Sequence, residues 1–299
     1  MTGLKRISVL TAAVGLLLCS AAAAQDYEIR LHRPMKVGQE FQLSATGRES
    51  QKATVTLNGQ PIKNESQEAA IEVEAAVKVL EIDKNGAPSK ASLKIGKCLS
   101  VKGDARTALV PAGAVVVASV AAARESVFEI NGEKVSPDAQ RALSQVFNLG
   151  KGGPTDDQIF GTPQRKKAGD SWPMNSEAAA EDARQNGAAV EKEDFSGTVT
   201  LEKVLKIGDT ECLQVAVAMD VARVRPPAPA GLVVEKGLAR RRMSGLFPVN
   251  PALNVPEKSS ALIITVVMKG KKTQPDAPDL VVETVAERQT TTRYTYPKN

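Results

Sequence analysis

The chain has 299 residues, of which 39 are Lys or Arg, 34 are Asp or Glu and one is His. Its formal net charge of +5 is small for this length and argues against nucleic-acid binding, which usually requires a concentrated basic face. Three cysteines without a CxxC spacing, together with a single histidine, argue against a structural zinc site.

Residues 1–24 have the pattern of a signal peptide. Lys5 and Arg6 give a positive start, residues 7–19 are apolar, and small residues follow, with cleavage expected after Ala24. The apolar stretch is short for a membrane-spanning helix. The sequence therefore predicts an exported protein, periplasmic or extracellular, with no transmembrane segment in the mature chain.

Cys19 leaves open the alternative of a lipid-anchored protein. Acylation of an exported protein at this cysteine would tether the chain to a membrane. The residue just before it is Leu18, whereas this processing usually needs a small residue there. We therefore favour ordinary cleavage of the signal peptide over lipidation.

After residue 25, apolar and polar residues alternate, which is typical of β-strands with one buried face. The alternation is clear at 71–79, and Asn85-Gly86 is expected to supply the positive φ angles of a hairpin turn that leads to a return strand ending at residue 98. Gly208-Asp209 predicts a second turn. The remaining predicted elements are a return strand to 219, strands at 231–249, 261–269, 280–287 and 290–296, and short helices at 136–150 and 176–187.

A short phrase occurs twice in the chain. "KVGQEF" at 36–41 and "KAGDSW" at 167–172 share the pattern Lys-x-Gly-x-x-aromatic, and "VLEID" at 79–83 resembles "VLKIG" at 204–208. Two matches at nearly the same offset suggest a duplication. We expect a mainly β (α+β) protein in which two antiparallel halves form one curved sheet or open barrel with one or two short helices. The predicted halves are residues 25–160 and 161–299.

Two features are candidates for lining a ligand site. Residues 109–123 form the most apolar segment after the signal peptide, and Val115, Val116 and Val117 lie at its centre. The segment is either a buried strand pair or an apolar flap over a lipid cavity. Trp172, the only tryptophan, is either a core anchor or a platform on which a ligand stacks.

Cys98 and Cys212 remain after removal of the signal peptide. In an exported protein two cysteines can form a disulfide, but they can equally be small buried hydrophobic residues. Pairing requires Cα atoms within about 7 Å of each other, which the sequence does not define. Both alternatives therefore stay open.

Arg240, Arg241 and Arg242 form a local basic run. A run of three is common on solvated strands and turns, and this is the favoured interpretation. The alternative is a contact with an anionic lipid or polymer.

Catalytic patterns are weak. His32 has no second histidine with which to share a metal, and no Gly-x-Ser-x-Gly motif accompanies it. Asp156 and Asp157 are adjacent carboxylates, but glycoside hydrolysis needs two carboxylates that face each other across a sugar. We therefore expect no enzymatic activity and name no catalytic, cofactor-binding or metal-binding residue.

With "KVGQEF", "KAGDSW" and the two hairpins in view, the chain resembles the secreted two-repeat β-proteins of unknown function from bacterial envelopes. More distantly it is similar to LolA-like periplasmic lipoprotein carriers, in which a curved sheet encloses an apolar groove. The second resemblance is architectural and transfers no functional residue.

Two functional hypotheses follow. In the first, the chain is an exported, non-enzymatic envelope protein that binds an apolar ligand or lipid. In the second, it is a structural or interaction protein of the envelope, with an unknown envelope partner and no small ligand. A ligand cavity would distinguish them, because a filled core leaves little empty volume.

Overall fold

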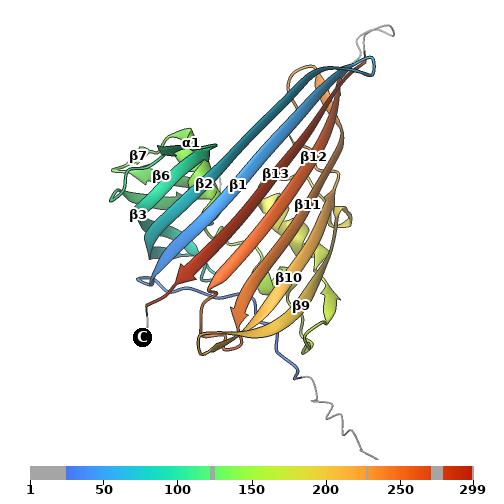
Figure 1. Ribbon diagram of the computed structural model, residues 1–299. Helices are drawn as coiled ribbons and strands as arrows, with labels where there is room; N and C mark the ends of the chain where they lie inside the picture. Colours follow the sequence, from blue (N-terminus) through green and yellow to red (C-terminus); the bar gives the residue numbers. More distant parts are fainter. Residues whose placement is uncertain (1–24, 122–124, 227, 271–278, 298–299) are drawn as a thin grey trace, which may run out of the picture.

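The computed structural model describes residues 25–121, 125–226, 228–270 and 279–297. The predicted signal peptide, Cys19 included, lies outside these residues. The described chain is mainly β and forms one open antiparallel sheet of 13 strands, as expected (Figure 1). The strand order is β7-β6-β5-β3-β2-β1-β13-β12-β11-β10-β9-β8, and β4 pairs with β3.

The strands differ widely in length. The longest are β1 (Glu40–Leu57), β2 (Gln60–Ile82), β3 (Pro88–Lys102), β11 (Leu232–Pro248), β12 (Glu257–Gly270) and β13 (Leu280–Thr295). The others are β4 (Ala105–Ala108), β5 (Val115–Val120), β6 (Ser126–Ile130), β7 (Glu133–Lys134), β8 (Ser171–Pro173), β9 (Phe195–Ile207) and β10 (Thr210–Ala222). The two predicted hairpins are β2-β3 and β9-β10.

Short helices pack against one face of the sheet. They are α1 (Pro137–Val146), α2 (Asp156–Phe160) and α3 (Ser176–Gln185), with a 3₁₀ turn at Lys192–Asp194. The sequence predicted one or two helices, and the five-residue helix α2 was missed. It forms because Thr155 and Gln158 cap its start reciprocally, although the segment is too short to show helical periodicity.

Two hydrophobic clusters lie on the helix-covered face. The first joins the buried faces of β1, β2, β3 and β5 to α1, whose Leu143 is fully buried. The second joins β9 and β10 to α3 and to residues 27–31 near the start of the described chain. A groove separates the helices of the two clusters, and the sheet runs continuously beneath it through the β1-β13 pair.

The Lys-x-Gly-x-x-aromatic phrases form two turns with the same backbone hydrogen bonds. Gly38 and Gly169 have φ angles of 83° and 94°, and their N–H groups donate to the carbonyl oxygens of Val79 and Leu201. Phe41 and Trp172 follow on β1 and β8 and are both buried. These bonds align Val79 with Leu201, rather than with Val204 as the sequence match suggested. The turns therefore match in structure, and the duplication of whole halves stays a prediction.

We expect Gly38→Ala and Gly169→Ala each to lower the free energy of unfolding by about 1–2 kcal/mol, because a Cβ is disfavoured at positive φ. No heavy atom lies within 4 Å of either added Cβ, so backbone conformation alone accounts for the loss. Chemical denaturation would measure it. Gly96→Ala is the matched control, since its Cβ would make ordinary contacts at 3.5 Å without a positive φ. A loss as large at Gly96 would contradict this explanation.

The β2-β3 turn differs from the prediction in one respect. Gly86 has a positive φ of 79°, but Asn85 is not among the described residues with positive φ. The turn is longer than a two-residue hairpin, and the side chain of Asp83 organises it by accepting hydrogen bonds from the N–H groups of Asn85 and Ala87. This local acceptor replaces the second positive φ that a tight Asn-Gly turn requires.

Both described cysteines are free thiols. Cys98 is buried in β3 and Cys212 in β10, and five strands lie between them in the sheet. At about 4.8 Å per strand step, the path between them along the sheet is roughly 29 Å. Burial raises the pKa of Cys98 to about 11. The pair left open by the sequence therefore forms no disulfide in this structure.

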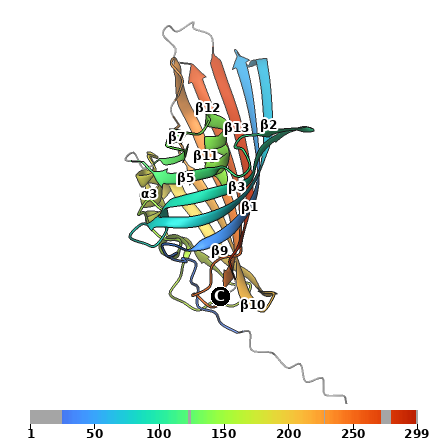
Figure 2. The same cartoon turned by 90° about the vertical axis from the view of Figure 1, so that its left-hand side faces the viewer.

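The sheet is taller than the helices that cover it. Figure 2 shows the far ends of β1, β2, β12 and β13 rising beyond α1 and α3. Among the described residues, no helix is both long enough and apolar enough to cross a membrane.

Candidate functional site

A groove of about 540 Å³ lies on the concave face of the sheet. Its floor is formed by β10, β11, β12 and β13, and its walls by the C-terminal end of α1 and by α2. Its volume falls within the range of roughly 300–1,000 Å³ that is typical of small-molecule sites. Other hollows among the described residues have similar volumes, but this groove is lined by two helices as well as four strands, which makes it the main candidate site.

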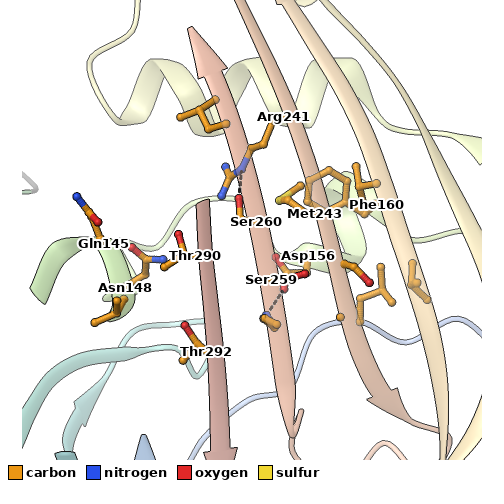
Figure 3. Close-up of a pocket in the computed structure, with 18 of the residues that line it drawn as sticks. Gln145, Asn148, Asp156, Phe160, Arg241, Met243, Ser259, Ser260, Thr290 and Thr292 are labelled. Atoms are coloured by element: carbon orange, nitrogen blue, oxygen red, sulfur yellow. Dashed lines mark hydrogen bonds and ion pairs between the residues drawn. The ribbon is translucent and has the colours of Figure 1, made fainter. Parts of the chain in front are cut away.

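The groove has an apolar side and a polar side (Figure 3). Phe160 and Met243 lie on the apolar side together with Leu31, Val215, Phe247 and Leu262. On the other side, Gln145 and Asn148 lie close to Thr290 and Thr292 of β13. Such a division of the lining suits a ligand that has an apolar part and a polar part.

Charged side chains lie on the floor between the two sides. The ammonium group of Lys258 donates to Oδ2 of Asp156 at 3.1 Å. Burial alone would raise the pKa of Asp156, but Lys258 holds it below its usual range, and Asp156 in turn raises the pKa of Lys258. Each group therefore keeps the other ionised near neutral pH.

Arg288 and Arg241 add two further cations. Arg288 donates to Oε1 of Glu49 at 3.3 Å, and Gln145 donates to the other oxygen of this carboxylate. Arg241 donates from Nε to the hydroxyl of Ser260 at 3.4 Å. Within the described part of the chain, Arg241 forms no ion pair with a carboxylate.

Burial lowers the pKa of Arg241, while the carboxylates of Asp156 and Asp182 act in the opposite direction. A guanidinium group nevertheless stays protonated at neutral pH. Three cations, Lys258, Arg241 and Arg288, thus line the groove beside one lining carboxylate, Asp156, which favours a ligand with negative charge.

The alternation along β11 explains how one arginine of the basic run reaches the groove. Arg241 shares a face with Ala239, Met243 and Phe247, which are buried or half-buried. Arg240 and Arg242 are exposed on the opposite face. From the sequence we favoured one solvated run for all three arginines. The apolar residues at every second position of β11 indicate instead that Arg241 points inward.

The candidate ligand-lining residues lie outside the groove. Val116 is fully buried in the first cluster, whereas Val115 is 50% exposed and Val117 half-buried. Trp172 is buried in the second cluster, and its Nε1 donates to the carbonyl oxygen of Phe160 at 2.8 Å. Trp172 therefore holds a groove residue in place from behind without lining the groove itself.

His32 and the two carboxylates singled out in the sequence lie near one another but do different things. Asp156 faces the groove, while Oδ1 of Asp157 accepts from the backbone N–H groups of Leu31 and His32. Nε2 of His32 lies 2.6 Å from the carbonyl oxygen of Asn85. Asp157 and His32 thus tie the N-terminal segment to its neighbours, and Asp156 is the only carboxylate among the described residues that line the groove.

Metal-binding geometry is absent from the part of the chain that the structure describes. No three His, Cys, Asp or Glu side chains gather there closely enough to hold an ion. The charged groups of the groove are instead suited to electrostatic contact with a ligand.

No protein-family model matches the chain, and no curated protein is significantly similar to it. Among solved structures, a lipovitellin described by its lipid–protein interactions is similar at a TM-score of 0.32 and 10% identity, over 89% of this chain and 26% of that chain. The chain thus spans about a quarter of the lipovitellin chain.

Two outer-membrane proteins are similar at lower scores. OprG from Pseudomonas aeruginosa has a TM-score of 0.16 and 8% identity, over 88% of this chain and 99% of that chain. The toluene transporter TodX from P. putida has a TM-score of 0.18 and 9% identity, over 92% of this chain and 96% of that chain. At these scores, none of the three likenesses carries an argument about function.

Proposed function

We propose that this chain is an exported, non-enzymatic protein of a bacterial envelope that binds one amphiphilic small molecule in the groove. The observation that carries the proposal is the groove's division into an apolar side and a polar, charged side. Export rests on the signal-peptide pattern of residues 1–24.

The alternative, a structural or interaction protein with a filled core, predicts little empty volume. The groove of about 540 Å³ favours a binding protein instead. The lipid hypothesis is also refined, because the ligand must satisfy charged groups as well as apolar ones. A purely apolar ligand would leave Arg241 and the Asp156–Lys258 pair desolvated without compensation.

Native mass spectrometry of the protein purified from its exported fraction tests the proposal. We expect a bound mass that disappears after denaturing lipid extraction. Met243→Trp should reduce the occupied fraction, because the larger side chain fills the groove. Arg242→Trp, one residue away on the opposite face, is the matched control and should keep the ligand. A bare chain mass, or equal occupancy in both variants, would contradict the proposal.

A further inference from the structure

On β12, β13 and β1 the concave face continues beyond the groove without charged side chains, whereas the flanking strand β2 places Glu65 and Lys63 on this face. Residues directly opposite each other on antiparallel strands share a face, so the strand pairings define rows across the sheet. The last charged row contains Arg241, Leu262, Arg288 and Glu49. The next three rows on β12, β13 and β1 are Ile264–Ala286–Gln51, Val266–Thr284–Ala53 and Met268–Val282–Val55.

This uncharged run, defined as those three rows, contrasts with the opposite face of the same strands. There, the neighbouring residues include Lys52, Glu283 and Glu287, all of them charged. A surface strand that faces water on both sides would carry polar residues on both. The opposite face also carries Ile263 and Val267, so the two sides differ mainly in charge, and the uncharged concave side is the one that suits an apolar cover.

The helices leave this run open. α1 and α3 lie beside the lower part of the sheet, and the far ends of β12, β13 and β1 rise beyond them (Figure 2). Within the run, Val266 is buried, and Ile264, Met268 and Val282 are half-buried by their neighbours in the sheet. One side of these side chains is therefore available to a ligand.

The run is long enough for an acyl chain. From Leu262 to Met268, β12 advances six residues, or about 20 Å at the usual rise of a strand. The acyl chains of one bilayer leaflet occupy about 15 Å, half the hydrocarbon thickness. A chain that begins at the charged row can thus lie entirely on the uncharged run.

Charge complementarity identifies the other end of the ligand. Lys258 and Arg288 already pair with carboxylates, whereas Arg241 donates a hydrogen bond only to the hydroxyl of Ser260 and feels Asp156 and Asp182 from a distance. The side chain of Arg288 is 41% exposed, so its terminal nitrogens can reach a ligand although its Nε is buried. Guanidinium groups bind phosphate and carboxylate oxygens through paired hydrogen bonds, so both arginines can still accommodate an anion.

We propose that the ligand is an anionic lipid whose charged headgroup binds Arg241 and Arg288 in the groove and whose acyl chain lies along the uncharged run. This inference rests on the proposed function and specifies the ligand's class and orientation. A phospholipid and a fatty acid share the required chemistry, an anionic group on an alkyl chain. A covering protein or second copy of the chain would not require a guanidinium group that lacks a carboxylate ion pair, as Arg241 does among the described residues.

The test compares four ligands with the same twelve-carbon chain on the delipidated full chain, by isothermal titration calorimetry. Dodecyl phosphate and dodecanoate are anionic, dodecanol is neutral and dodecyltrimethylammonium is cationic. We expect at least one anionic ligand to bind about 10-fold or more tightly than the neutral and cationic ones, with the difference shrinking at high salt. Whichever anion binds more tightly identifies the headgroup as phosphate or carboxylate.

Variants locate the two ends of the ligand. Arg241→Gln should weaken anion binding by about 10- to 100-fold and leave dodecanol unaffected, and Arg241→Lys should restore part of the loss. Arg240→Gln, on the opposite face, is the matched control and should bind as the unaltered chain does. Met268→Lys should weaken dodecanol and the anions alike, whereas Val267→Lys on the opposite face should not.

The outcomes separate the two proposals. If none of the four ligands binds, the proposed function fails. If all four bind equally, or Arg241→Gln and Arg240→Gln behave alike, amphiphile binding stands and the anionic-lipid inference is wrong. If Met268→Lys has no effect while Arg241→Gln does, the acyl chain does not follow the run, and the inference is likewise overturned.

Discussion

Replacing Trp172 with alanine is expected to lower the free energy of unfolding by about 3–5 kcal/mol. The indole ring is 5% exposed in the second cluster, so its removal leaves a cavity that the surrounding strands and helices only partly close. The substitution also removes the hydrogen bond of 2.8 Å that Nε1 of Trp172 donates to the carbonyl oxygen of Phe160. Urea denaturation followed by circular dichroism would measure the loss.

Trp172→Phe separates packing from the hydrogen bond. It keeps most of the apolar volume and loses only the indole N–H, so we expect a smaller loss than for alanine, including about 1 kcal/mol for the bond. Because Trp172 lies behind the groove, ligand occupancy should survive in this variant. Loss of the ligand with little loss of stability would instead support the stacking platform considered from the sequence.

Local patterns predicted the elements of this fold well. Alternation identified both hairpins, and the repeated Lys-x-Gly-x-x-aromatic phrase identified two turns with the same hydrogen bonds. These features depend on neighbouring residues alone, since the pleat places every second side chain on one face and glycine permits the positive φ. Helix α2 was not predicted, because a helix of five residues is too short to show helical periodicity in its sequence.

The groove could not be predicted in the same way. Arg241, Lys258 and Arg288 come from three strands, and only the register of β11, β12 and β13 brings them to one floor. Register follows from pairings across the sheet, which the sequence of one strand does not define. The inward position of Arg241 was accessible from its apolar neighbours at every second residue, whereas its proximity to Asp156 was not.

The residues that the sequence suggested as ligand-lining lie outside the groove for a related reason. Val116 and Trp172 are among the most apolar positions of the chain, and such residues fill the two clusters first. The groove instead lies where the helices of the two clusters leave the sheet uncovered. Strong hydrophobicity therefore predicted the core, and the candidate groove coincides with the mixed polar and apolar positions between the clusters.

Phe41→Ala is the corresponding substitution in the first cluster, with an expected loss of about 3–5 kcal/mol in the free energy of unfolding. Phe41 is 2% exposed, and its ring centroid lies 5.8 Å from that of Tyr294 and 5.5 Å from that of Tyr296. The contact joins the start of β1 to the end of the described chain. Gln42→Ala, an exposed neighbour on the same strand, is the control and should change stability by at most about 0.5 kcal/mol.

Combining Phe41→Ala with Trp172→Ala tests whether the two clusters are energetically separate. The two side chains belong to different clusters and share no packing partner among the residues assigned to them. Their effects should therefore add to within about 0.3–0.5 kcal/mol, as for independent sites. A larger deviation would mean that the continuous sheet couples the clusters beneath the groove. A ligand in the groove would then change the stability of both clusters, because the walls of the groove come from α1 on one side and α2 on the other.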